Sequence, residues 1–192
     1  SREVMTATIS EYIKGCEPCQ RAKRPRVGAG EHHIAEIGDR PNDVLGGDVF
    51  YVGKKVDGYD TTLDFVDYFS RRVTATATKG VPTSETIMDV LIGTVIRSGG
   101  VPREIRSDLG SNFISAAVKS IYATMGIKMV HGTAYSHHLV ALVERWHQTL
   151  KQLLLCHWTA KGDLPWYKCL PLLELAYNST VNRETGYSPF FI

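Results

Sequence analysis

Three short runs of β-forming residues constrain the fold of this chain more than any other feature. Residues 45–52, 61–66 and 72–78 are rich in Val, Thr and Phe, and turn-like segments at 54–58 and 68–71 separate them. Short consecutive strands with short connections are typical of an antiparallel meander. The sequence therefore predicts three antiparallel strands in chain order.

After these strands the pattern changes to alternating helices and strands. A helix is expected from about residue 83, where Thr83 or Ser84 can cap it, to the Gly99-Gly100 pair. The elements expected beyond it are a strand at 104–107, a helix at 112–125, a strand at 127–130, a polar loop at 131–138 and helices at 139–159 and 164–178. The order β-β-β-α-β-α-β-α-α predicts an α/β fold with a mixed five-stranded sheet flanked by helices.

Length and charge set broad limits on function. The 192 residues suffice for one domain of about 150 residues and a smaller appendage. A net charge of +2 does not by itself predict nucleic-acid binding, and the basic cluster at 21–26 is also typical of a solvated linker. No run approaches the ~18 apolar residues of a membrane span. Both ends are expected to be cuts in a longer polyprotein, because the chain starts within a predicted helix and stops at Phe190-Phe191-Ile192 without a closing turn.

Three acidic residues occupy positions from which their side chains can converge. Asp48 interrupts an apolar strand, and Asp108 directly follows the predicted strand at 104–107. Glu144 lies in the first turns of the long helix. If the first and fourth strands are neighbours, Asp48 and Asp108 face one crevice, and a helix packed there directs Glu144 into it.

Such a group of carboxylates predicts a metal site. Mg²⁺ and Mn²⁺ prefer oxygen ligands and keep positions open for substrate phosphates. Two such ions about 4 Å apart activate an attacking oxygen and stabilise a leaving one. Each acid alone is most simply a surface or turn residue, so the prediction depends on the three together. Together they indicate a site that cuts or joins phosphodiester bonds.

Several motifs surround these acids in a fixed order. Between Asp108 and Glu144 lie 35 residues. The motifs are V-D-Y-F-S-R at 66–71, S-D-L-G-S-N-F at 107–113, V-E-R-W-H-Q-T-L-K at 143–151, Y-N at 177–178 and T-G-Y-S-P-F at 185–190. The spacing and these motifs resemble the D,D-35-E signature and the surrounding sequence of the integrases of retroviruses and long-terminal-repeat retrotransposons, especially the gypsy-like branch. The resemblance extends from about residue 10 to the end of the chain.

The resemblance implies a fold, an activity and partners. It implies an RNase H-like core in which Asp48, Asp108 and Glu144 are the catalytic residues and the ligands of Mg²⁺ or Mn²⁺. It implies trimming of the 3′ ends of element DNA and transfer of those ends into target DNA. The implied partners are element and target DNA and further copies of the chain, without a membrane. The implied location is the nucleus, after particle assembly in the cytoplasm.

The resemblance also divides the chain. Residues 1–26 are similar to the C-terminal remnant of an HHCC-type zinc-binding module, 27–44 to a linker and 45–192 to the catalytic core. Cys16 and Cys19 would supply half of a zinc site, and Zn²⁺ would bind only if a His pair lies upstream of Ser1. An alternative pairs the cysteines with His32 and His33, but those histidines lack the spacing of a C2H2 finger.

One face of the long helix is predicted to contact DNA. His147, Gln148 and Lys151 follow Glu144 by three, four and seven positions, so they share its face. Lys151 is expected on phosphate and Gln148 on base or sugar edges. The alternative is an ordinary solvated helix face. Trp146 and Leu150 are expected in the core.

One departure from the family keeps a second function open. L-V-A at 139–141 stands where the family has a polar run containing glycine, and loss of glycine restricts the backbone. The alternative is therefore a decayed or domesticated integrase domain that binds DNA or protein without catalysis. A hydrolase of RNA–DNA hybrids ranks last, because that class usually carries four acids and lacks the C-x2-C segment.

Overall fold

The computed structural model describes most of the chain. The described residues are 2–16, 37–98, 100–107, 115–131, 141–160 and 163–192. Predictions for Asp108, Cys19, His32, His33 and most of the loop at 131–138 therefore fall outside them. Among the described helices, none has the length and apolar character needed to cross a membrane.

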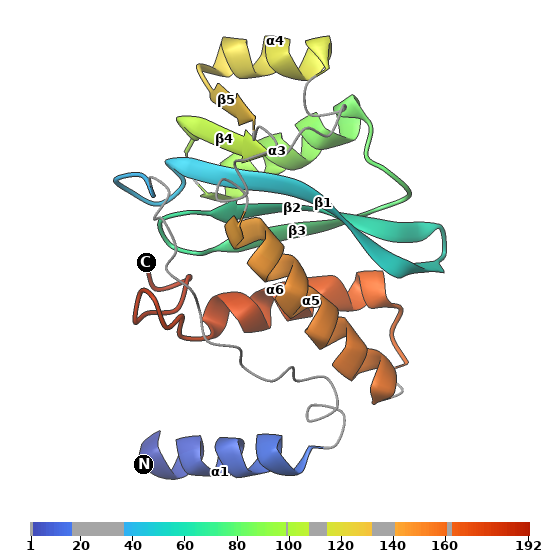
Figure 1. Ribbon diagram of the computed structural model, residues 1–192, viewed down its shortest axis with the longest axis vertical. Helices are drawn as coiled ribbons and strands as arrows, with labels where there is room; N and C mark the ends of the chain where they lie inside the picture. The colour runs from blue at the N-terminus through green and yellow to red at the C-terminus, as the bar shows by residue number, and fades with distance from the viewer. Residues whose placement is uncertain (1, 17–36, 99, 108–114, 132–140, 161–162) are drawn as a thin grey trace.

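A mixed five-stranded sheet forms the centre of the molecule (Figure 1). Its strands are β1 (Val44–Val56), β2 (Tyr59–Asp67), β3 (Val73–Thr78), β4 (Glu104–Ser107) and β5 (Lys128–His131), in the order β3-β2-β1-β4-β5. β1, β2 and β3 pair antiparallel, whereas β4 runs parallel to both β1 and β5. The predicted fold class is confirmed. The first and fourth strands are neighbours, which is the condition on which the predicted convergence of Asp48 and Asp108 depended.

The first hairpin is tighter than predicted. β1 continues to Val56, and the turn consists of Asp57 and Gly58 instead of the expected segment at 54–58. Both residues have positive φ angles, 53° and 89°, which a two-residue turn of the twisted hairpin type requires. The turn therefore lies at the last two residues of the expected segment, because the Asp-Gly pair adopts these angles readily.

The described helices are α1 (Arg2–Gly15), α3 (Ser84–Ser98), α4 (Ala116–Met125), α5 (Ala141–Thr159) and α6 (Trp166–Ser179). α4 begins later than the predicted residue 112, because the side chain of Ser115 caps it by accepting a hydrogen bond from the Val118 amide. It ends at Gly126, whose φ of 71° is left-handed.

Two apolar cores lie on opposite faces of the sheet (Figure 1). α3 and α4 cover one face, where Leu45 and Phe65 are buried with Ile87 and Tyr122. α5 and α6 cover the other face, where the buried residues are Val66, Val73, Val143, Trp146, Leu150, Leu154, Trp166 and Leu170. Because side chains alternate along a strand, Gly46, Asp48 and Phe50 of β1 face the side of the sheet that α5 and α6 cover.

Gly46 lets α5 approach β1 closely. A Cβ at this position would lie 2.6 Å from Cγ2 of Val143 and 2.8 Å from Cε2 of Tyr68. The first turn of α5 therefore packs on the backbone of β1. This contact lies two residues before Asp48 and involves the residue that precedes Glu144.

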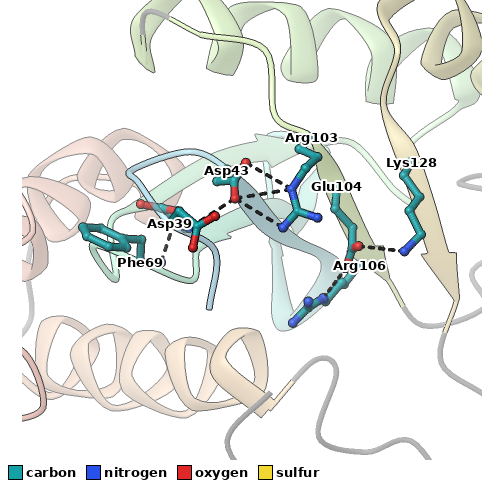
Figure 2. Close-up of polar contacts among 8 residues, drawn as sticks. Asp39, Asp43, Phe69, Arg103, Glu104, Arg106 and Lys128 are labelled. Atoms are coloured by element: carbon teal, nitrogen blue, oxygen red, sulfur yellow. Dashed lines mark hydrogen bonds and ion pairs between the residues drawn. The ribbon is translucent and has the colours of Figure 1, made fainter. Parts of the chain in front are cut away.

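A charged network joins the start of β4 to its neighbours, as Figure 2 shows. Asp43, just before β1, accepts hydrogen bonds from Arg103. Oε1 of Glu104 lies 2.7 Å from Nε of Arg106, and Oε2 lies 3.1 Å from Nζ of Lys128. The Glu104 and Arg106 side chains are each only 4% exposed. We call Glu104, Arg106 and Lys128 the Glu104 cluster.

Candidate active site

Asp48 lies in the middle of β1, on the face covered by α5. Its direct cross-strand partner is Asp64 on β2, so the two side chains share that face. Oδ1 of Asp48 accepts a hydrogen bond of 2.7 Å from the Val49 amide, and Oδ2 lies 3.6 Å from Nδ1 of His147. The Asp48 side chain is 23% exposed, so solvent still reaches it.

Asp108 lies outside the described residues, but the strand that leads to it is defined. Ser107, the last residue of β4, pairs with Gly47, the residue before Asp48. β4 therefore ends one residue before Asp108, and its last residue lies beside the residue that precedes Asp48. This register is the neighbouring arrangement on which the predicted convergence of Asp48 and Asp108 depends.

Glu144 lies in the first turn of α5 and is exposed. The next residue, Arg145, points to a different partner and forms an ion pair with Glu184. Across the described part of the chain, no three His, Cys, Asp or Glu side chains form a metal-binding group, and Asp108 is not among them.

The acidic side chains of β1 and of the first turn of α5 fit a hard divalent ion. Asp48 and Glu144 are carboxylates, both reach solvent, and the Gly46–Val143 contact holds their elements together. The proposed zinc ligands are different: Cys16 directly follows α1, and Cys19 lies outside the described residues. The partial zinc site therefore stays a prediction.

His147 does not lie where the sequence placed it. It is only 8% exposed, and its ring stacks on Phe50 with the ring centroids 4.9 Å apart. The prediction that its side chain shares the exposed face of Glu144 is wrong, whereas Gln148 and Lys151 are exposed as expected.

Helix geometry explains the difference. At about 100° per residue, position 147 lies roughly 60° from Glu144, toward the buried stripe that contains Trp146 and Leu150. Position 148 lies about 40° to the other side. Trp146 and Leu150 are both fully buried, as predicted.

The buried carboxylate of Asp64 is a feature that the sequence analysis missed. Its Oδ2 accepts hydrogen bonds from Nε1 of Trp146 at 3.0 Å and from Oγ1 of Thr62 at 2.9 Å. The same oxygen lies 3.0 Å from Nε2 of His147. We call Asp64, His147, Trp146 and Thr62 the Asp64 cluster. The signal was available, because Asp64 interrupts a β-forming run just as Asp48 does.

Two atoms of the Asp64 cluster are incompletely satisfied. Among the described residues, Oδ1 of Asp64 and Nε2 of His147 are buried without a hydrogen bond of good geometry. The approach of 3.0 Å between His147 and Asp64 is therefore a close polar contact whose angle departs from that of a linear hydrogen bond. Buried polar groups usually have partners, so this one calls for an explanation.

A family comparison covers half of the chain. Residues 38–137 match the family described as integrase core domain. The matched segment includes Asp48 and Asp108 and ends before Glu144.

Relatives extend the likeness over nearly the whole sequence. The chain is 29% identical over 188 residues to the Pol polyprotein of Feline endogenous virus ECE1, covering 96% of the chain and 17% of that polyprotein. It is 30% identical over 186 residues to the Gag-Pol polyprotein of Baboon endogenous virus (strain M7), covering 96% and 10%. The chain thus spans less than a fifth of the length of either polyprotein.

Solved structures share the fold. The chain superposes with a TM-score of 0.73 and 25% identity on a chain of the simian T-cell lymphotropic virus intasome in complex with PP2A regulatory subunit B56 gamma, covering 91% of this chain and 62% of that one. The HTLV-2 integrase catalytic core domain in complex with magnesium gives 0.66 and 24%, covering 79% and 96%. The RNase H-like arrangement expected from the sequence is confirmed by these neighbours. Since the family match includes half of the residues and the sheet carries Asp48 at the expected strand position, the chain belongs to the integrase core domain family.

Proposed function

We propose that this chain is the catalytic domain of a retrotransposon integrase, which trims the 3′ ends of element DNA and transfers them into target DNA. The observation that carries the proposal is the position of Asp48. It lies on the central strand, beside the end of β4 and beneath the helix that bears Glu144. This arrangement supports convergence of Asp48, Asp108 and Glu144.

Asp48, Asp108 and Glu144 would hold Mg²⁺ or Mn²⁺, two ions in the complete site. When bound, such ions activate the attacking oxygen and stabilise the leaving oxygen of a phosphodiester. Support comes from the all-oxygen donor set and from the relative HTLV-2 core, whose structure is described as a complex with magnesium. The chain itself would position Asp48 on β1 relative to Glu144 on α5, through the close contact between Gly46 and Val143.

Gln148 and Lys151 are proposed to contact DNA beside the metal site. Both are exposed on the side of α5 that carries Glu144. A lysine placed there would neutralise a phosphate, whereas the Gln148 amide can donate to and accept from sugar or base edges. Lys151→Ala should weaken DNA binding by a similar factor for all sequences and reduce the slope of log affinity against log salt by about 1. An unchanged slope would remove Lys151 from the interface.

Assembly into a homo-oligomer on DNA, acting in the nucleus, completes the proposal. Related proteins support the first part: the simian T-cell lymphotropic virus structure is an intasome, and the HTLV-2 core has dimeric and trimeric forms. We also propose that residues 1–26 belong to a zinc module. In a longer chain with the upstream His pair, Cys16→Ser should abolish stoichiometric Zn²⁺ binding.

The catalytic proposal is tested by Mn²⁺-dependent nicking of a DNA duplex that carries element ends. Asp48→Asn, Asp108→Asn and Glu144→Gln should each reduce nicking by at least about 100-fold, because each removes a ligand worth several kcal/mol in the transition state. Circular dichroism should show an intact fold. The matched control is Asp89→Asn, which changes an exposed acid on α3 and should leave nicking unchanged.

Two results would overturn the catalytic proposal. Full nicking activity in any of the three variants would exclude that residue from the catalytic site. DNA binding without nicking at every Mn²⁺ and Mg²⁺ concentration would favour the alternative of a domain that binds without catalysis.

A further inference from the structure

We propose that Asp64 and His147 form a buried support that positions the carboxylate of Asp48 for metal binding. The inference rests on the proposed metal site and adds two residues to it. Neither residue would bind the metal. His147 would act through Asp48, and Asp64 would act through His147.

The first argument is the geometry of the imidazole. The two ring nitrogens of His147 face different carboxylates: Nδ1 lies 3.6 Å from Oδ2 of Asp48, and Nε2 lies 3.0 Å from Oδ2 of Asp64. Because Asp48 and Asp64 are direct partners across β1 and β2, the ring bridges the two strands from above. A ring flip would exchange the nitrogen and carbon positions and disturb both contacts.

The second argument is that the ring is held in place. Phe50 stacks on it at an interplanar angle of 29°, and the His147 side chain is only 10% exposed. On the far side, Asp64 is fixed by hydrogen bonds from Trp146 and Thr62. Since α5 carries both Trp146 and His147, a single carboxylate anchors two consecutive residues of the helix to β2.

The third argument is the burial of Asp64. Its side chain is fully inaccessible, and its Oδ1 has no hydrogen-bond partner among the described residues. A buried carboxylate costs folding free energy that an apolar residue on the same strand would avoid. Val66, the next residue on this face of β2, packs in the core beneath the same helix. The location of Asp64, opposite Asp48 and against His147, offers a functional reason for its presence.

The bridge explains how Asp48 can be both oriented and open. Metal-binding carboxylates usually accept hydrogen bonds from neighbouring groups, and loss of such a partner typically weakens metal affinity 10- to 100-fold. The Val49 amide holds Oδ1 of Asp48, and His147 faces Oδ2. Both contacts restrict rotation of the carboxylate while part of it stays accessible to solvent.

The experiment is an EPR titration of the full chain with Mn²⁺, in which the signal of free Mn²⁺ reports binding without any catalytic step. His147→Leu should weaken binding at the Asp48-dependent site by about tenfold. His147→Asn should recover part of the affinity, because its amide can still donate toward Asp48. Asp64→Asn should weaken binding less than His147→Leu. The double variant should be no weaker than His147→Leu, because Asp64 acts through His147.

The matched control is Asp43→Asn, which changes another buried acid, located just before β1, that has its own partner, Arg103. This variant should lower stability without changing Mn²⁺ affinity. Circular dichroism and urea unfolding establish which variants are folded, and the His147 variants keep the test decisive if Asp64→Asn does not fold.

The outcomes separate the two proposals. If the wild-type chain binds Mn²⁺ and Asp48→Asn abolishes that binding, but folded His147→Leu binds normally, the positioning role is refuted and the metal site stands. Equal weakening in Asp43→Asn would also refute it, since the effect would then reflect general stability. If the wild-type chain has no Asp48-dependent Mn²⁺ binding, the proposed catalytic site fails, and the positioning role fails with it.

Discussion

The Glu104 cluster and the Asp64 cluster each bury a carboxylate that belongs to a strand of the sheet, yet their charges are arranged differently. In the Glu104 cluster one carboxylate faces two cations, Arg106 and Lys128. In the Asp64 cluster the imidazole of His147 faces the carboxylate of Asp64 and, outside the cluster, that of Asp48. Two buried atoms of the cluster lack hydrogen bonds of good geometry. The negative charge of Glu104 is therefore balanced by cations, as in a structural ion pair. The polar atoms of the Asp64 cluster are only partly satisfied, which is typical of functional sites.

The largest expected effect comes from breaking the Glu104 cluster. Arg106→Met should lower the free energy of unfolding by about 3–5 kcal/mol, because it leaves the buried carboxylate of Glu104 without its closest cation. Urea unfolding measures the loss. The double variant Glu104→Leu/Arg106→Met should recover much of it, since no uncompensated charge stays buried. A loss below about 1 kcal/mol would show that the pair contributes little.

Asp64→Asn should have a smaller effect on stability, about 1 kcal/mol. The asparagine oxygen still accepts hydrogen bonds from Trp146 and Thr62, so only the contact with His147 changes character. The comparison predicts opposite profiles: Arg106→Met loses stability and keeps Mn²⁺ affinity, whereas Asp64→Asn keeps most stability and loses affinity. If urea unfolding shows equal losses for the two variants, the distinction between the clusters is wrong.

Acidic pH should reduce the stability of the fold, because two paired carboxyl groups have lowered pKa values in the folded chain. The hydrogen bond from Arg103 lowers the pKa of Asp43. Burial alone would raise the pKa of Glu104, but hydrogen bonds from Arg106 and Lys128 outweigh it and lower the pKa.

The sign follows from these directions. A carboxyl group whose pKa is lower in the folded chain stabilises the fold above its unfolded pKa and loses that contribution as the pH falls through its folded pKa. The unfolded values are 3.8 for Asp43 and 4.5 for Glu104, so stability should decline below about pH 4.5. Urea midpoints between pH 6 and pH 3 measure this, and Glu104→Gln should flatten the decline. An equal slope in that variant would assign the acid sensitivity to other groups.

The smallest effect is expected at the solvent-facing member of the Glu104 cluster. Lys128→Ala should cost less than about 1 kcal/mol, because the lysine side chain is 68% exposed and water screens its attraction to Glu104. Thermal unfolding at low and high salt measures the difference between this variant and wild type. A loss as large as that of Arg106→Met would mean that both cations are required to compensate Glu104.

The sequence predicted the strands and helices that carry the site better than the orientation of the side chains buried between them. The order of strands and helices, the bounds of β4 and the central position of Asp48 followed from local pattern and turn chemistry. The orientation of His147 did not, because spacing alone shows that 144, 147, 148 and 151 are neighbours without showing where the buried stripe of the helix ends. That boundary depends on which residues of β1 and β2 lie beneath the helix.

The bridge between Asp64 and His147 was unpredictable for a related reason. The two residues are 83 positions apart, and their contact requires both the register of β1 against β2 and the seat of α5 on the sheet. Hydrophobic periodicity specifies neither to the accuracy of a hydrogen bond. An acid within a β-forming strand was the only signal available, and it led to Asp48 but not to Asp64.

The missing side chain at Gly46 has a mechanical consequence for the two acids. Val143 rests on peptide backbone, which has no rotamers and cannot repack, so the height of the helix above the strand is set by a hard stop. Leu150 and Leu154 are buried farther along α5, about two and three turns beyond this contact. This contact therefore sets the spacing between β1 and the first turn of α5, which carries Glu144. The distance between the elements that carry Asp48 and Glu144 therefore depends on the absence of a side chain at Gly46, and any larger residue there should change it.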